Sequence, residues 1–253
     1  MTTPPWARAR IGWVVDVQND FMRPDGRLYV HNLFDPADAG ATLAMASIVK
    51  TVEWMHRSCD VVIFTGDWHA YGDREIDTVA PDATKGTYPP HCMGLSPDAA
   101  ERAGAHLITE IDPGSAALVL TRDATDETAR DIARRAVGER RAVFVQKSEF
   151  SVFEGNRSAD AFVQALREAL GEAFGAVLGD DLGDGSGEPV DFVLCGVATD
   201  VCVKKAVDGL LDRTARVHVV TDAIWSLGLL GPADTTDLWA QRGARLGVSA
   251  DLP

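Results

Sequence analysis

An aspartate, a lysine and a cysteine each stand just beyond an apolar run of this 253-residue sequence. Asp16 follows Ile-Gly-Trp-Val-Val, Lys147 follows Phe-Val-Gln, and Cys202 comes shortly after a run that ends at Gly196. A thiolate is a strong nucleophile, a carboxylate can accept the proton of the thiol, and an ammonium favours both anions. The three residue types could therefore perform nucleophilic catalysis if the fold brings them together.

Cys202 lies where a helix is expected to begin. Thr199 or Asp200 would be a suitable N-cap, which places the thiol in the first helical turn. Free N–H groups and the helix dipole favour a thiolate there and can hold an oxyanion. Each position also has a plainer interpretation: an inert buried thiol for Cys202, a turn or cap for Asp16, and a surface ammonium for Lys147. No single position decides between the two.

A second group of residues has the chemistry of a metal site. Asp67 and His69 are separated by one residue after an apolar run, so both side chains can face one point at an extended strand end. His91 follows in the next loop and would be a third ligand. One carboxylate and two imidazoles suit zinc, iron or manganese, and the alternative is a capped turn with a satisfied histidine. The histidines expected to be structural or exposed are His31, His56, His106 and His218.

Alternating strand and helix patterns would position these residues. Apolar runs typical of strands buried on both faces occupy residues 11–15, 61–64, 142–145, 192–196 and 217–220. Helical spacing of apolar residues covers residues 37–57, 124–138, 159–170, 201–212 and 233–246. The alternation predicts an α/β fold with a doubly wound parallel sheet. Because ligands bind beyond the carboxyl ends of the strands in such sheets, we expect the polar residues there to converge in one crevice.

The composition narrows the classes of partner. The formal net charge of −14 argues against nucleic acid and anionic membranes, because such a surface repels phosphate groups. No apolar run approaches the roughly 20 residues that span a bilayer, and no signal peptide is evident, so a cytoplasmic protein without a membrane partner is expected. The four cysteines form no C-x-x-C pair, so we expect neither a zinc knuckle nor a disulfide framework. Cys59 and Cys195 are expected to be inert core thiols.

The length suits one domain over residues 1–253. Within it, residues 179–189 are acidic and glycine-rich, which predicts a flexible surface loop. A calcium-binding loop is the alternative, although the spacing differs from that of an EF-hand.

Four segments resemble motifs of the isochorismatase-like cysteine hydrolases. WVVDVQNDF at 13–21 and GVATDVCV at 196–203 are similar to the opening strand and the nucleophile segment of that family. Lys147 with the FSVF that follows it resembles the lysine segment. DWH at 67–69 with YPPHCMG at 88–94 resembles the metal site of the nicotinamidase branch. The resemblance extends through the last predicted strand, and the four motifs together are far more specific than any one of them.

The resemblance implies a mostly parallel six-stranded sheet with helices on both faces. It implies a catalytic triad of Asp16, Lys147 and Cys202. It also implies a cis peptide bond before Ala198 and an oxyanion hole formed by the N–H groups of Ala198 and Cys202. The other implied site residues are Phe21, Tyr88 and Phe153 for the substrate and Asp67, His69 and His91 for a divalent metal. Zinc is the expected metal, with iron or manganese as alternatives.

The implied activity is hydrolysis of a small amide, nicotinamide or a close aromatic amide, to the acid and ammonia through a thioester. The family also implies a homo-oligomer. Some nicotinamidases carry another histidine after the Asp-x-His pair, and here Glu75 or water could fill that coordination place. The same triad could instead act on an aliphatic amide, an N-carbamoyl compound or a lactam. A vinyl-ether hydrolase and a non-catalytic binding module are alternatives of other classes, and the retained triad argues against both.

Overall fold

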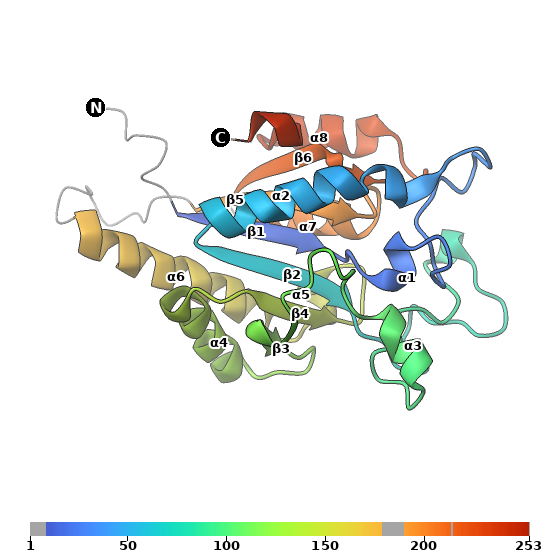
Figure 1. Ribbon diagram of the computed structural model, residues 1–253, viewed down its shortest axis with the longest axis horizontal. Helices are drawn as coiled ribbons and strands as arrows, with labels where there is room; N and C mark the ends of the chain where they lie inside the picture. Colours follow the sequence, from blue (N-terminus) through green and yellow to red (C-terminus); the bar gives the residue numbers. More distant parts are fainter. Residues whose placement is uncertain (1–8, 179–189, 214, 253) are drawn as a thin grey trace.

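The computed structural model describes residues 9–178, 190–213 and 215–252, and a seven-stranded sheet forms its centre (Figure 1). The strands are β1 (Arg10–Val15), β2 (Val61–Asp67), β3 (Leu118–Leu120), β4 (Val143–Lys147), β5 (Asp191–Val197), β6 (Arg216–Trp225) and β7 (Arg245–Gly247). Their order is β3-β4-β2-β1-β5-β6-β7, and each neighbouring pair is parallel. The chain adds strands on one side of β1 and then on the other, which makes the carboxyl end of β1 the point where such sheets bind ligands.

Helices surround this sheet. The α-helices are α1 (Asn19–Met22), α2 (Met45–Ser58), α3 (Ala99–Gly104), α4 (Asp126–Glu139), α5 (Val152–Gly155), α6 (Ala159–Leu178), α7 (Cys202–Asp212) and α8 (Thr236–Gln241). The 3-10 helices are η1 (Gly40–Leu43), η2 (Ala83–Lys85), η3 (Gly114–Ala116), η6 (Pro232–Asp234) and η7 (Ser249–Asp251). Figure 1 shows α2 in front of the sheet, whereas α4 and α6 lie together along the other face.

Both faces of the sheet are buried, and this explains why the strands are apolar runs. Along β1, Trp13 and its alternate neighbours belong to one apolar cluster, and Val14 belongs to the other. Residues of α2, among them Ile48 and Met55, join the cluster of Val14, whereas α4, α6 and α7 join that of Trp13. A parallel strand covered in this way favours apolar side chains on both faces, and β2 is likewise buried along its whole length.

The predicted fold class is confirmed, but the predicted number of six strands is one too few. The five apolar runs are β1, β2, β4, β5 and β6, and the two other strands lie at the edges. β3 and β7 have only three residues each, which is too short for a recognisable pattern. Residues 233–246, predicted as one helix, contain α8 and the first two residues of β7. Gly243 adopts a φ of 93° between them, and a residue in that conformation cannot continue a helix.

Two further predictions concern membrane-spanning segments and the acidic loop. In the three described ranges, none of the helices is both long and apolar enough to cross a bilayer. The predicted acidic loop at residues 179–189 lies outside the described residues.

Candidate active site

Four polar side chains meet beyond the carboxyl ends of β1, β2, β4 and β5. Asp16 directly follows β1, Asp67 ends β2, Lys147 ends β4, and Cys202 opens α7 after β5. Asp67 and Lys147 are partners in the ladder between β2 and β4. The order of the strands thus brings together residues that are far apart in the chain.

The Lys147 ammonium lies at the centre of this group, and its side chain is only 1% exposed. Its Nζ atom lies 2.9 Å from Asp16 Oδ2 and 3.8 Å from Cys202 Sγ. The same ammonium donates a hydrogen bond to Asp67 Oδ1. The structure therefore places the aspartate, the lysine and the cysteine in one cluster and adds Asp67 as a second carboxylate.

The carboxylates of Asp16 and Asp67 share the ammonium of Lys147, and this arrangement shifts the pKa values of all three groups. Burial opposes the charge of Lys147, but Asp16 and Asp67 raise its pKa well above the usual range. Burial also opposes the charge of Asp67, yet Lys147 and the nearby histidines hold its pKa well below normal. The pKa of Asp16 is raised by burial and by the charge of Asp67, against the attraction of Lys147. Thr65 donates a 2.8 Å hydrogen bond to Asp16 Oδ1, Oδ2 faces the Lys147 ammonium, and an oxygen of this carboxylate lies within 4.8 Å of the Cys202 sulfur.

The Cys202 thiol is buried at the first residue of α7, and burial raises its pKa well above normal despite the opposing field of Lys147. A raised pKa favours the protonated thiol, which calls for a base that accepts its proton before attack. The N-cap is Val201 and not Thr199 or Asp200. The carboxylate of Asp200 is engaged elsewhere, because it accepts the N–H groups of Leu227 and residues beyond it.

The backbone before Cys202 faces the same pocket. The peptide bond between Val197 and Ala198 is cis, as the resemblance implies. Within the described part of the chain, the N–H groups of Ala198 and Cys202 meet no backbone acceptor, and both residues line the pocket. Both N–H groups are thus free for the predicted oxyanion hole, whose role remains a prediction.

Asp67, His69 and His91 form the cluster that their spacing predicts for a metal site. Asp67 Oδ2 lies 3.7 Å from His69 Nε2 and 3.8 Å from His91 Nε2, and ligand atoms of all three lie within 4.8 Å of one another. The opposite ring atoms are held by oxygen: His69 Nδ1 lies 3.2 Å from Asp73 Oδ2, and His91 Nδ1 lies 2.8 Å from the carbonyl oxygen of Pro89. Partners of this kind orient metal-binding histidines.

Two buried atoms beside this cluster lack a hydrogen-bond partner among the described residues, namely His69 Nε2 and Glu75 Oε2, which lie 4.0 Å apart. Burial and the charge of Asp67 raise the pKa of Glu75 to about 9. Against the effect of burial, the nearby carboxylates of Asp67 and Asp73 raise the pKa of His69 to about 9. Buried polar atoms without partners are costly, and a divalent cation would satisfy both. The residues Asp67, His69 and His91 therefore fit a metal, and the unpartnered oxygen of Glu75 lies beside them.

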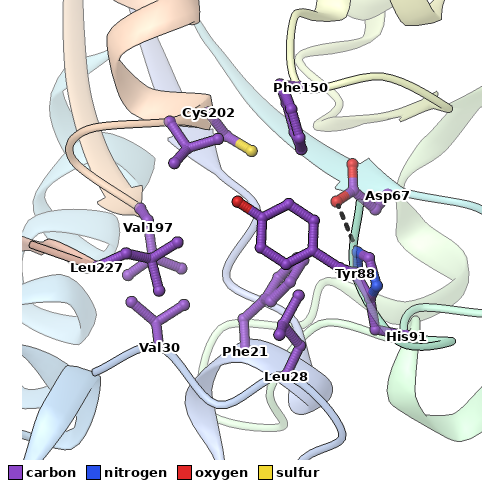
Figure 2. A pocket seen from close by; sticks show the side chains of 12 residues that line it. Phe21, Leu28, Val30, Asp67, Tyr88, His91, Phe150, Val197, Cys202 and Leu227 are labelled. Carbon is purple, nitrogen blue, oxygen red and sulfur yellow. Dashed lines mark ion pairs between the residues drawn. The ribbon is translucent and has the colours of Figure 1, made fainter. Parts of the chain in front are cut away.

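A small pocket of about 360 Å³, measured out to its open mouth, lies in front of the Cys202 thiol (Figure 2). Figure 2 shows the Tyr88 ring across the middle of the pocket, with its hydroxyl turned toward the side of Cys202. The Phe150 ring lies edge-on to Tyr88 at 5.7 Å between centroids. The apolar and aromatic part of the wall includes Phe21, Val30, Tyr88, Phe150, Val197 and Leu227. Such walls suit a small, flat, largely apolar substrate.

Phe153, which the resemblance implies as a substrate-binding residue, does not line this pocket. Its ring packs against Gly209 of α7, and the Arg213 guanidinium lies 3.7 Å from the ring centroid. The turn of α5, which begins at Val152, carries this side chain away from the pocket. Phe150 lies in the pocket wall in its place.

Gln18 holds Asp67 in position, a role that its sequence neighbourhood did not reveal. Its buried side chain donates to the carbonyl oxygens of Asp67 and Ala105 at 2.8 and 2.7 Å, and accepts the N–H of Asp67 at 2.8 Å. The amide thus pairs with the end of β2 where β1 has stopped, after Asp16 turns the chain with a φ of 52°. The partners of this amide become apparent only when β1 and β2 are paired.

Comparison with solved structures supports the fold. The chain is similar to N-carbamoylsarcosine amidase from Thermoplasma acidophilum, with a TM-score of 0.58 and 22% identity over 96% of this chain and 98% of that chain. It is also similar to PnC1 from L. infantum in complex with nicotinate, with a TM-score of 0.62 and 18% identity over 96% and 94% of the two chains. The pyrazinamidase of Pyrococcus horikoshii in complex with zinc gives a TM-score of 0.55 and 19% identity over 94% and 98%.

Among curated proteins, none matches the sequence of this chain significantly. The family description "Isochorismatase domain" matches residues 13–249. This range contains all seven strands except the first residues of β1, and it contains every side chain of the site described above. The chain belongs to the isochorismatase family.

Proposed function

We propose that the protein is a cysteine-dependent amidohydrolase that cleaves a small amide to a carboxylic acid and ammonia. The observation that carries this proposal is the buried Lys147 ammonium, which lies 2.9 Å from Asp16 and 3.8 Å from the Cys202 sulfur. Removing three ionisable groups from water is costly, and a binding module has no need of such a cluster. Perturbed groups that converge at a pocket are instead typical of catalysis.

The proposed reaction begins when the carboxylate of Asp16 accepts the thiol proton of Cys202. The sulfur attacks the amide carbon, and the N–H groups of Ala198 and Cys202 bind the oxygen that becomes negative. Asp16 returns its proton to the nitrogen, the C–N bond breaks, and ammonia leaves a thioester on Cys202. Water then attacks the thioester, Asp16 accepts a proton from it, and cleavage of the C–S bond releases the acid. The sulfur regains the proton from Asp16, while Lys147 remains charged and balances the carboxylates.

The metal would be held by Asp67, His69 and His91, with Glu75 beside them. When bound, a divalent metal supplies a Lewis acid that can orient a ring nitrogen of the substrate or a water molecule. His91 also lines the pocket, so this cluster and the substrate share one wall. Zinc, iron and manganese all suit this ligand set, and a second carboxylate at Glu75 increases its suitability for the harder ions.

The substrate that fits best is nicotinamide or a close aromatic amide. The rings of Phe21, Tyr88 and Phe150 border the pocket, and one of the similar structures contains nicotinate. N-carbamoyl compounds are the second candidate, since a similar structure is an N-carbamoylsarcosine amidase. The two candidates differ in whether the group next to the reacting carbon is an aromatic ring or a nitrogen.

A substrate panel tests the proposed function. We expect ammonia release from at least one of nicotinamide, pyrazinamide, benzamide, glutaramide and N-carbamoylglycine, measured with a coupled ammonia assay on protein of known metal content. Turnover of nicotinamide with none of N-carbamoylglycine would select the aromatic amide. If no amide in the panel releases ammonia above the rate of a buffer blank, the proposed activity is wrong.

Replacing a histidine that binds the metal should weaken metal binding more than replacing a residue that only supports a ligand. We expect His91→Ala to weaken zinc binding by more than the roughly 10–100-fold that changes in supporting residues produce. The Kd is measured by competition with a chromophoric chelator, so the result does not depend on activity. His106→Ala is the matched control, because His106 is exposed and lies outside the cluster. Equal zinc affinity in the two variants would exclude His91 as a ligand.

A further inference from the structure

A second, larger cavity continues outward from the catalytic pocket. Leu28, Tyr88 and Leu227 line both, so the two spaces meet at these side chains, which Figure 2 labels in the wall of the inner pocket. The outer space, here called the vestibule, measures about 920 Å³ including its open side. An amide that occupied only the inner pocket would leave this space to water.

The vestibule differs in charge from the rest of the protein. Arg27 and His31 are among the residues that line it, and none of its described lining residues carries a carboxylate. The whole chain has a formal net charge of −14, so a wall with an arginine and without acids is a local exception. A guanidinium in a cleft that lacks lining carboxylates attracts anionic groups and concentrates them there.

The Arg27 guanidinium is only partly engaged by protein groups. Its Nη1 atom donates to Glu101 Oε1 at 3.0 Å, and its side chain is 37% exposed. The carboxylate of Glu101 is shared, because it also accepts the hydroxyl groups of Tyr71 and Ser96. Arg23 differs, since both of its terminal nitrogens bind Glu110, at 3.1 and 2.6 Å. Arg27 therefore retains donors for another partner, and Arg23 does not present a comparable fork.

We propose that the vestibule binds an anionic tail of the substrate, a carboxylate in the simplest case, while the amide lies at Cys202. This inference rests on the proposed amidohydrolase function and, among the aromatic and N-carbamoyl amides proposed there, favours those that carry an acid at the other end. The Arg27 fork matches the two oxygens of a carboxylate, and His31 lies in the same wall. Tyr88 and Leu28 then contact the part of the substrate that joins its two ends.

The test compares pairs of amides that differ only in charge. Para-carboxybenzamide is paired with para-acetylbenzamide, and glutaramate with its methyl-ketone analogue, and ammonia release is measured for each. We expect kcat/KM to be higher for the acid in at least one pair. Arg27→Met should lower that preference by about five- to tenfold, which is the size expected for one partly exposed charge-assisted contact. Arg27→Lys should retain part of the preference.

Arg23→Met is the matched control. Arg23 is also an arginine paired with a glutamate, but it does not line the vestibule. It should leave the preference unchanged, and the neutral amide of each pair reports on folding in every variant. Equal kcat/KM for acid and neutral amides, or a preference that Arg27→Met leaves intact, would overturn the inference while the proposed function stands. Absence of ammonia from all four amides and from the wider panel would overturn both.

Discussion

Replacing Cys202 by alanine should abolish ammonia release, lowering kcat by at least about 10⁴-fold, as loss of the nucleophile does in enzymes whose catalytic residues act as a unit. The reason is that neither Asp16 nor Lys147 can form the covalent bond to the substrate carbon. The measurement is single-turnover ammonia release with mass spectrometry of the quenched protein. Wild-type protein should carry an acyl group that hydroxylamine removes, and the alanine variant should carry none.

Cys59→Ala is the matched control for this variant. Cys59 and Cys202 have the same exposed fraction, 7%, so each substitution removes a sulfur of similar burial. Burial raises the pKa of Cys59 to about 12, and its thiol lies in the apolar cluster away from Lys147. The control should keep its activity and its acyl adduct. Full activity in Cys202→Ala would refute the proposed mechanism.

Replacing Lys147 by methionine should both inactivate and destabilise the protein. The ammonium offsets the charges of two buried carboxylates, Asp16 and Asp67, and its removal leaves them facing each other without a cation. Breaking a buried ion pair in this way costs about 3–5 kcal/mol of unfolding free energy. Chemical denaturation monitored by tryptophan fluorescence measures the loss, and it should be done on metal-free protein so that a bound cation cannot compensate.

Lys204→Met separates this effect from the loss of any lysine. Lys204 forms an ion pair with Asp208 on α7 at 2.6 Å, but it is partly exposed, so we expect a loss of no more than about 1 kcal/mol. Adding Asp67→Asn to Lys147→Met should recover part of the stability, because one of the opposed charges is removed, without recovering activity. An unchanged denaturation midpoint in Lys147→Met would show that the two carboxylates are not both charged in the folded protein.

The sequence alone determined the class of fold and predicted that the candidate site residues meet at one edge of the sheet. Apolar runs alternating with helical spacing predict a parallel α/β sheet, because only strands buried on both faces are apolar at every position. The carboxyl ends of parallel strands share one edge of the sheet. Asp16 and Lys147 follow two of these apolar runs, and this position predicts that they meet Cys202. Asp67, His69 and His91 were grouped by their spacing in the same way. The two edge strands were not predicted, because a strand of three residues is too short to show a recognisable pattern of apolar residues.

Only the tertiary structure decided which groups are partners and in what state. It paired Lys147 with Asp67 as well as Asp16, placed Phe150 in the pocket in place of Phe153, and joined Gln18 to the end of β2. It also showed that burial raises the pKa of the Cys202 thiol although this residue opens a helix. These outcomes depend on side-chain direction and on desolvation by segments distant in the chain. Neither quantity is encoded in the spacing of residues along it, since both arise only when the sheet is assembled.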